Sequence, residues 1–355
     1  VYAPLLLYAL LCDMANVRLS TVCLQEAYAS CFFVERSFQT VKHFTKVLPI
    51  LSIALALILD IVLPDNLQHP AAEHPYFIWL LGAALVVYLI FYAVSFFRPS
   101  LREKLEYKAY FYAGAALFLN ILNLLTVKFA ILPVLYFPSL DRVFGVLFED
   151  SVFLAKCLAY SARLLFIGWF CGAIVGMLTG IAIGFNKTFS YWVQPLVRVL
   201  GPIPSTAWIP IVLIAFPSAV SASAFLIALA VWFPTTVLTS SGIAAIPNAY
   251  FEVSSTLGAG SFYRIAKVGI PAAMPHMFLG LFNGTCSSFI TLVTAEMLGA
   301  KYGIGWYINW QKEMMAYANV YAGLIIIAVT FFILITLLFK FRDHVLAWQK
   351  GVIKW

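Results

Sequence analysis

The residues that could do chemistry in this 355-residue sequence are few and widely separated. The nearest approach to a phosphate-binding loop is the segment 180–188, but Lys187 does not directly follow a glycine, and the segment ends a long apolar run instead of opening a helix after a strand. His69, Glu73 and His74 are close enough in sequence to contact a metal, yet three candidate ligands among prolines favour a solvated loop. We therefore predict no catalytic site, and no cofactor or metal bound by this chain.

Two ionisable residues lie near the ends of apolar runs and are candidates for a solute pathway. Glu296 is near the end of one run, and ionisable groups at membrane depth are functional candidates by default. A structural alternative stays open, in which its carboxylate holds a helix end. Arg163 begins another run, where it could attract an anion or simply extend its side chain toward water.

The composition requires a solvent other than water. Hydrophobic residues make up 63% of the chain and charged residues only 10%, whereas a soluble domain carries about 25% charged residues. The Lys and Arg residues behind the net charge of +7 lie between apolar runs, and no segment interleaves basic and aromatic residues. The sequence therefore predicts membrane lipid, and no nucleic acid, as a partner.

Long runs that are almost free of charge predict membrane-spanning helices, because about 20 apolar residues cross the hydrocarbon core. The stretch from Val199 to Phe251 has no charged residue, but its prolines predict two helices with a break near Pro217. Asp60 makes the first run the weakest candidate. The predicted spans cover 47–63, 76–97, 109–127, 164–185, 199–216, 222–243, 272–295 and 316–339.

The loops alternate in charge along this series of spans. Most of the Lys and Arg residues fall at the start, in the loop 98–108, around 187–198, around 264–267 and in the tail. Basic loops favour the cytoplasmic side. We therefore predict that both termini face the cytoplasm, which an even number of spans also requires.

One predicted span carries a glycine at every fourth position. Small residues at this spacing let a neighbouring helix approach closely in lipid, so the series predicts a helix-packing face, with a pore-lining role as the alternative. Its members are Gly168, Gly172, Gly176, Gly180 and Gly184.

The loop between the sixth and seventh spans holds the most informative pattern. Residues 248–257 can form a short helix, Gly258 permits a sharp turn, and a second amphipathic helix would carry Arg264 and Lys267. Pro271 fits the first turn of the next span, where its missing N–H costs little. The sequence thus predicts a rigid helix–turn–helix on the cytoplasmic face.

The spacing from Glu252 to Gly258 and on to Ile270-Pro271 resembles the signature loop of binding-protein-dependent ABC importer permeases. The family has Glu-Ala-Ala where this chain has Glu-Val-Ser, and often Leu before the proline. The segments VLGPIPSTAWIPIVLIAF, TLVTAEMLGAKYGIGWYI and ILPVLYFPSLDRVFGVLFEDS are similar to the branch that handles nitrate, sulfonate, taurine or bicarbonate. By this resemblance, the residues that couple to an ATPase are Glu252, Leu257, Gly258, Arg264 and Pro271.

The resemblance implies an all-α, polytopic transmembrane helical bundle, with a type I permease domain over 109–355 and an extension over 1–108 carrying two predicted spans. The coupling loop is 248–271. The implied partners are ABC ATPase subunits that bind ATP and Mg²⁺, a second and identical permease subunit, and an external solute-binding protein. The chain would then be a non-enzymatic subunit of the inner or plasma membrane that moves a small anion by alternating access. A secondary transporter or channel working without ATP is the alternative.

Overall fold

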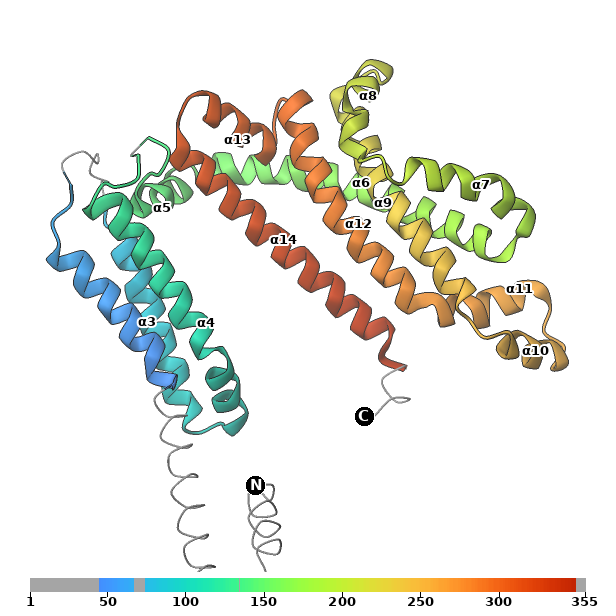
Figure 1. The fold of residues 1–355 in the computed structure, drawn as a ribbon, viewed down its shortest axis with the longest axis horizontal. Helices are drawn as coiled ribbons and strands as arrows, with labels where there is room; N and C mark the ends of the chain where they lie inside the picture. The colour runs from blue at the N-terminus through green and yellow to red at the C-terminus, as the bar shows by residue number, and fades with distance from the viewer. Residues whose placement is uncertain (1–44, 67–73, 134, 349–355) are drawn as a thin grey trace, which may run out of the picture. The chain divides into compact units, whose positions relative to one another are not determined.

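The computed structural model describes residues 45–66, 74–133 and 135–348, which form helices and turns with no strand among them (Figure 1). They divide into two compact units, one up to Asp141 and one from Arg142 onward. In these residues 7 helices are long and apolar enough to cross a membrane, or 8 if a bent pair counts as one span. The predicted all-α bundle of about eight spans is confirmed. The predicted placement of both chain ends concerns residues outside the described ranges.

The first unit contains the helix Thr45–Val62, α3 (Tyr76–Ser95) and α4 (Pro99–Asn123), which η1 (Leu124–Lys128) extends by a π-helical turn. The predicted boundary between residues 108 and 109 lies inside α4. A small apolar cluster joins the three helices, made of Ile53, Ala56, Phe77, Leu81 and Ala116.

Charged and amide side chains also join the helices of the first unit. Lys46 is buried and pairs with Glu106 at 2.6 Å. The Lys128 ammonium lies 3.2 Å from the Asp60 carboxylate, which also accepts a hydrogen bond from the Asn123 amide at 2.6 Å. Asp60, the residue that weakened the first predicted span, is therefore matched by a positive charge within its own unit.

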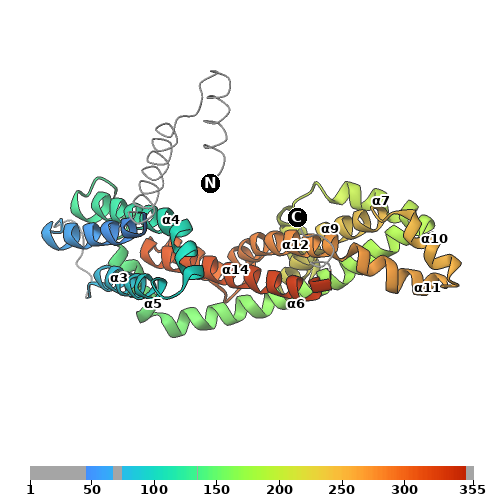
Figure 2. The same ribbon diagram turned by 90° about the horizontal axis from the view of Figure 1, so that it is seen from below.

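Three long helices form the centre of the second unit: α6 (Ser151–Phe185), α9 (Ala219–Ala244) and α12 (Ile270–Gly299). They lie side by side in both ribbon views (Figures 1 and 2). Each is longer than the span predicted from the sequence, because its ends continue past the apolar run.

The order of contacts along α6 and α9 shows that the two helices run parallel. Gly168 lies against Ile227, and Gly184, sixteen residues later in α6, lies against Ile243, sixteen residues later in α9. Two helices that touch and run in the same direction need a connection that returns from one end to the other. The chain between them must therefore make one further crossing of the bundle.

That returning crossing is broken. It consists of α7 (Lys187–Leu200), the 3-10 turn η2 (Ser205–Trp208) and α8 (Ile209–Ala215), and its two halves meet at an angle of 87°. The prediction of one helix over 199–216 is wrong.

Proline explains the break. Pro202 and Pro204 lack the N–H groups that a continuous helix needs, and their rings clash with the preceding turn. The predicted end near Pro217 is confirmed, because α8 ends at Ala215 and α9 begins at Ala219.

The remaining helices complete the second unit. α5 (Leu140–Glu149) contains the division between the units, and α13 (Ile304–Glu313) and α14 (Tyr317–Val345) follow α12. α13 packs on the start of α6 through a buried cluster of Leu154, Cys157, Ile304, Tyr307 and Ile308.

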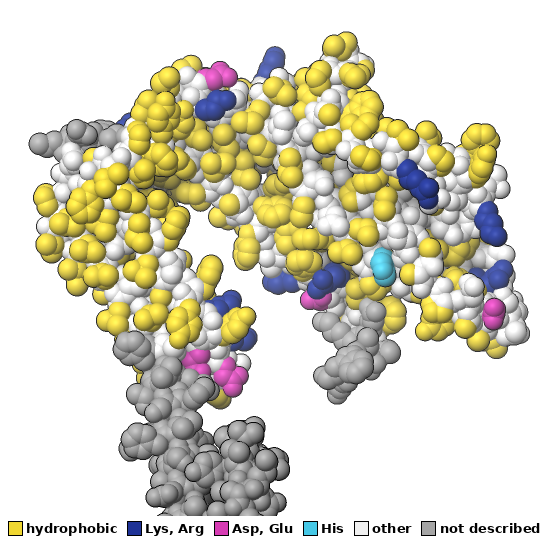
Figure 3. Space-filling view, in the orientation of Figure 1, with side chains coloured by type: hydrophobic (Ala, Val, Ile, Leu, Met, Phe, Trp, Pro, Cys, Tyr) yellow, Lys and Arg dark blue, Asp and Glu magenta, His cyan; other side chains and the backbone are white. Residues whose placement is uncertain are grey.

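The surface is that of a protein embedded in lipid. Apolar side chains cover most of the face shown in Figure 3, and the charged ones are few. Large apolar residues on the long helices point outward, among them Val175, Leu178, Ile290 and Phe332, each at least half exposed. Helices with such surfaces satisfy their own backbone groups, as a membrane requires.

Candidate functional site

The loop between α9 and α12 has its first arm and its turn as the sequence predicts, whereas its predicted short second helix is continuous with the next span. Its first arm is α10 (Asn248–Thr256), and its turn lies at Gly258, which has a φ of +81°. Residues other than glycine are strained in this left-handed region, so the turn depends on Gly258. The second arm, α11 (Ser261–Tyr263), continues through the π-helical segment η3 (Arg264–Gly269) into α12 without a break. Pro271 occupies the first turn of α12.

Arg264 ties the two arms of this loop together. Its guanidinium donates hydrogen bonds to the hydroxyl of Ser255 at 2.8 Å, on the first arm, and to that of Ser261 at 3.1 Å, on the second. The side chain is therefore engaged within the loop. Glu252 and Lys267, by contrast, are exposed to the surroundings.

The far end of the loop exposes apolar and aromatic side chains, which we call the apolar tip. Leu257 is 81% exposed and Phe262 is 83% exposed. The loop lies at one end of the second unit in both ribbon views (Figures 1 and 2). Contiguous exposed apolar residues mark interaction surfaces. The members of the apolar tip are Tyr250, Val253, Leu257, Phe262 and Tyr263.

Sequence reasoning missed most of the apolar tip. Among its members only Leu257 was predicted to couple, on the strength of the family resemblance. Three of the others, Tyr250, Phe262 and Tyr263, are aromatic. Their clustering in a loop otherwise rich in Ser, Thr and Gly could have indicated an interaction surface, but the family spacing does not include them.

The glycine series of α6 lies along the contact with α9. A Cβ atom built on Gly180 would lie 2.6 Å from the Cβ of Thr239, and one on Gly176 would lie 2.8 Å from the Cβ of Thr235. Contacts this short do not occur between real side chains, so each of these positions needs a hydrogen atom in place of a side chain. Thr236 adds a polar link by donating to the Gly176 carbonyl at 3.2 Å.

Glu296 lies buried at the end of α12, with 1% of its surface exposed. Its Oε2 accepts a hydrogen bond from the backbone N–H of Gly305 at 2.8 Å. Gly303 has a φ of +137°, and a Cβ there would lie 2.5 Å from the carboxylate carbon. The carboxylate thus packs directly against the turn that starts α13, which favours the structural alternative. Arg163 is exposed and lines a cavity of about 430 Å³ at this end of the unit.

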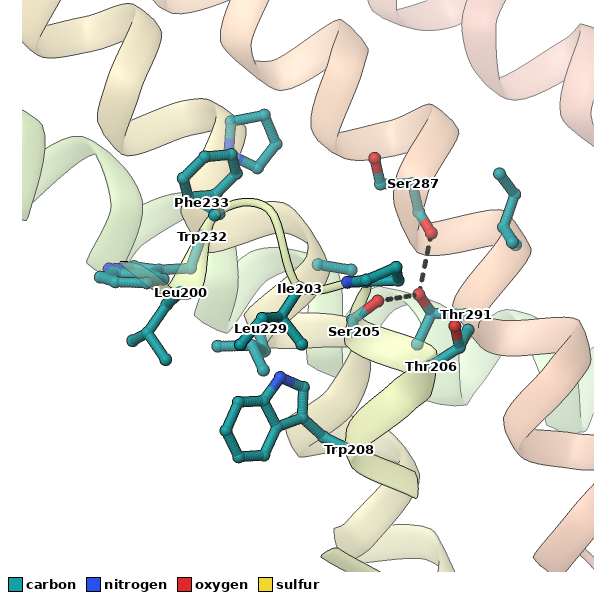
Figure 4. A pocket seen from close by; sticks show the side chains of 15 residues that line it. Leu200, Ile203, Ser205, Thr206, Trp208, Leu229, Trp232, Phe233, Ser287 and Thr291 are labelled. Atoms are coloured by element: carbon teal, nitrogen blue, oxygen red, sulfur yellow. Dashed lines mark hydrogen bonds between the residues drawn. The ribbon is translucent and has the colours of Figure 1, made fainter. Parts of the chain in front are cut away.

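The break between α7 and α8 forms a second cavity, of about 350 Å³, which we call the elbow pocket. The polypeptide turns around it at residues 201–204, while α9 and α12 supply its other walls (Figure 4). Ser205 and Thr291 share a hydrogen bond of 2.7 Å between their hydroxyls. The prolines of this segment predict breaks in a helix, and no site was predicted from them.

Of the three metal candidates of the sequence, only His74 belongs to the described residues. His69 and Glu73 lie outside those ranges. His74 stacks on Trp79, with ring centroids 5.8 Å apart.

Comparison with known proteins points to one family. The family model described as "Binding-protein-dependent transport system inner membrane component" matches residues 172–349, which is half of the chain and lies within the second unit.

Curated relatives agree with this match. A Bacillus subtilis (strain 168) permease protein named for aliphatic sulfonate transport is 32% identical over 163 residues, 46% of this chain and 59% of that protein. A bicarbonate transport system permease protein of Synechococcus elongatus is 32% identical over 189 residues, 53% of this chain and 65% of that protein. A nitrate import permease protein of Leptolyngbya laminosa is 32% identical over 173 residues, 47% and 62% of the two chains. The chain thus spans about six-tenths of the length of these relatives.

Proposed function

The chain belongs to the family of binding-protein-dependent transport system inner membrane components, and from this premise we propose that it is the permease subunit of an ATP-driven importer for a small anion. The relatives are transport permeases of the nitrate, sulfonate, taurine and bicarbonate branch, and they are not enzymes. Their named solutes share a small size and an anionic oxygen-bearing group. That shared chemistry supports an anion as the solute of this chain.

The observation that carries the proposal is the apolar tip on a rigid loop. Gly258 sets the turn, Arg264 joins the arms, and apolar side chains remain exposed at the end. An ATPase subunit that covers the apolar tip would remove this surface from water. In our proposal ATP and Mg²⁺ are bound by that partner, and this chain hydrolyses nothing.

The way in which the loop joins the bundle supports alternating access. The second arm continues through η3 into α12 without a break, so a force on the loop acts on a helix that packs along α9. A partner that binds the loop differently in its nucleotide states would then bias the bundle between inward-facing and outward-facing forms. A second copy of the chain would enclose the solute path, and an external binding protein would deliver the solute.

The charge pattern gives the orientation that this mechanism needs. Arg264 and Lys267 belong to the coupling loop, and Lys187 follows the end of α6, where Phe185 packs on Phe251 of the loop. All three basic residues therefore lie at one end of the unit. By the positive-inside tendency, this end faces the cytoplasm of a cell with the protein in its inner or plasma membrane, and we place both termini on the same side.

The test is co-purification of the ATPase with variants of the loop. Gly258→Val forces a branched side chain into a left-handed backbone, and Glu252→Lys reverses an exposed charge on α10. We expect both to reduce the amount of ATPase recovered with the membrane subunit by about ten-fold, a loss of about 1.4 kcal/mol of binding free energy.

Gly260→Val is the matched control. Gly260 lies in the same turn, but it has a φ of −66° and open space around it. Normal ATPase recovery with both Gly258→Val and Glu252→Lys would contradict the coupling role, and solute uptake that needs no ATPase would favour the secondary transporter or channel.

A further inference from the structure

The elbow pocket lies near the middle of the bundle along its long axis. On α9 its lining residues run from Leu229 to Pro234, about as far from Ala219 at one end of that helix as from Ala244 at the other. On α12 it is lined by Ser287, Ile290 and Thr291, which lie 8 to 12 residues before the helix ends at Gly299. The break in the α7–α8 crossing therefore lies at the depth of the membrane interior.

A broken helix at this depth needs an explanation. Backbone that is not helical is tolerated inside a membrane only where protein buries it or where it lines a cavity that holds water. Here Gly201, Ile203 and Pro204 line the elbow pocket, and Pro202 and Pro204 remove two N–H groups that would otherwise need partners.

The walls of the elbow pocket differ from the rest of the bundle surface. Figure 4 shows hydroxyl side chains of η2 and α12 grouped on one side, and the rings of Trp208, Trp232 and Phe233 on the other. No charged residue lines the pocket among the residues that the structure describes. The hydroxyl residues are Ser205, Thr206, Ser287 and Thr291.

Several hydrogen-bond donors of the elbow pocket are free to serve a ligand. Thr291 and Ser205 bond to each other, and Thr291 also donates to the Ser287 carbonyl at 3.0 Å. Within the described ranges, the hydroxyls of Thr206 and Ser287 and the indole N–H of Trp208 have no partner in the protein. An indole can only donate and a hydroxyl can do both, so the set suits a ligand that mainly accepts hydrogen bonds.

We propose that the elbow pocket is the point on the solute path where this chain contacts its solute, and that the solute is a small oxyanion held by neutral donors. This inference rests on the permease function proposed above. The described lining of the elbow pocket carries no positive charge. An anion without a counter-charge is bound weakly and leaves readily, as transport through the pocket requires.

Uptake by the reconstituted complex tests the proposal. The full transporter in liposomes, with its binding protein and ATPase, is assayed with nitrate, bicarbonate and ethanesulfonate as probes. Thr206→Val and Ser287→Ala each remove one donor, and we expect each to lower anion uptake per ATP hydrolysed by about five-fold, the effect of one neutral hydrogen bond. Thr206→Ser, which keeps the hydroxyl, should restore uptake.

Thr294→Val is the matched control. Thr294 lies on the same helix as Ser287 but outside the pocket, and its hydroxyl donates to the Ile290 carbonyl at 2.8 Å. We expect uptake and ATPase binding to match the unaltered complex.

A second measurement reports directly on access and charge preference. In a chain whose native cysteines are replaced, Thr206→Cys should react at least five-fold faster with a small anionic sulfonate thiol reagent than with a trimethylammonium reagent of similar size. Thr294→Cys should show no such preference.

The outcomes separate this inference from the proposed function. If the unaltered complex imports an anion with ATP but Thr206→Val and Ser287→Ala behave like Thr294→Val, the elbow pocket assignment is wrong and the permease function stands. If the ATPase neither binds nor drives uptake, the proposed permease function is wrong, and the pocket assignment that rests on it is wrong as well. If the complex drives uptake of none of the three anions, or the two thiol reagents react equally, the oxyanion assignment is overturned.

Discussion

The two units of this protein join their helices in different ways. In the first unit, Lys128 contacts carboxylates of Asp60 and Asp65, and Lys46 pairs with Glu106. In the second unit, the long α6–α9 contact has no ion pair in the part that the structure describes, and the glycine series of α6 brings the two backbones together.

These two kinds of contact respond differently when a force acts to separate or slide the helices. A charge pair fixes a few atoms strongly and resists any change that separates them, because a charge left alone in a dry surrounding is costly. A face of small residues spreads its contacts over the whole helix length, each one weak. The family model matches only the second unit, which is also the unit that must move in the proposed transport cycle.

The largest effect should come from breaking the ion pairs of the first unit. Lys128→Met leaves the Asp60 carboxylate, whose side chain is 9% exposed, without its positive partner. We expect the free energy of unfolding to fall by about 3 kcal/mol, the usual cost of an isolated buried charge. Thermal unfolding in detergent measures this loss.

The double variant Asp60→Asn with Lys128→Met is the control for that prediction, since it removes both charges. Recovery of most of the lost stability would confirm that the pair, and not the length of the lysine side chain, is responsible. No recovery would mean that the first unit depends on packing in the same way as the second.

A bulky residue in the glycine series should have the next largest effect. Gly172→Val places a side chain against the backbone of Ala228, which cannot move away without separating α6 from α9. We expect a loss of about 2 kcal/mol from overpacking, seen as a lower yield of monodisperse protein and a lower unfolding temperature.

Gly114→Val on α4 is its matched control, because nothing lies within 4 Å of a Cβ built there. Equal losses of stability for Gly172→Val and Gly114→Val would show that the α6–α9 contact does not require small residues. The proposed difference between the two units would then be wrong.

Glu296 is an exception within the second unit, because it is a buried carboxylate in a region held mainly by small residues. Glu296→Ala removes the acceptor for the Gly305 N–H, and we expect a loss of about 1.5 kcal/mol, as for a hydrogen bond to a charged group. Glu296→Gln keeps an acceptor oxygen and should lose much less, by the same unfolding measurement. Similar losses for both variants would show that the negative charge itself is needed.

The smallest effect should come from Asp141, the last residue of the first unit. Its Oδ1 accepts a hydrogen bond from the Phe77 N–H in the first turn of α3 at 2.8 Å, so Asp141→Ala should cost about 1 kcal/mol, as for a lost helix cap. Asp141→Asn keeps the acceptor and should be close to neutral.

The pH dependence of stability gives Asp141 a second test. Burial raises the pKa of the Asp141 carboxyl, so the folded chain binds its proton more tightly than the unfolded chain does. Its contribution is therefore fully present below the ordinary pKa of an aspartate and is lost as the pH rises through the raised value. Asp141→Asn should remove this part of the pH profile, and an unchanged profile would contradict the assignment.

Much of the fold follows from the sequence because its signals are local. A charge-free run of 20 residues, a proline that lacks an N–H, and Gly258 in a turn each act within a few residues. The helix α10 and the turn at Gly258 were therefore predictable, whereas the helical stretch that contains Pro271 begins ten residues earlier, at Ser261.

The rest depends on contacts between segments that are distant in the chain. The prolines mark locally where the 199–216 segment breaks, but nothing local tells that Ser287 and Thr291 complete a pocket there. Nor does anything local tell that Arg264 joins two arms of a loop instead of facing a partner. The orientation of Glu296 toward Gly305 has the same origin. Such features emerge only when α9 and α12 are packed together.

The continuity of α11, η3 and α12 makes this stretch a lever. Ser261–Gly299 contains 39 residues in helical geometry, of which α12 (Ile270–Gly299, 30 residues) is about 45 Å long at about 1.5 Å per residue. A tilt of α12 by only about 5° about one end would displace the other end by about 4 Å. A small tilt imposed at the apolar tip would thus grow into a larger displacement along α12, and Thr291, in the half of α12 farther from the apolar tip, would be carried across the mouth of the elbow pocket.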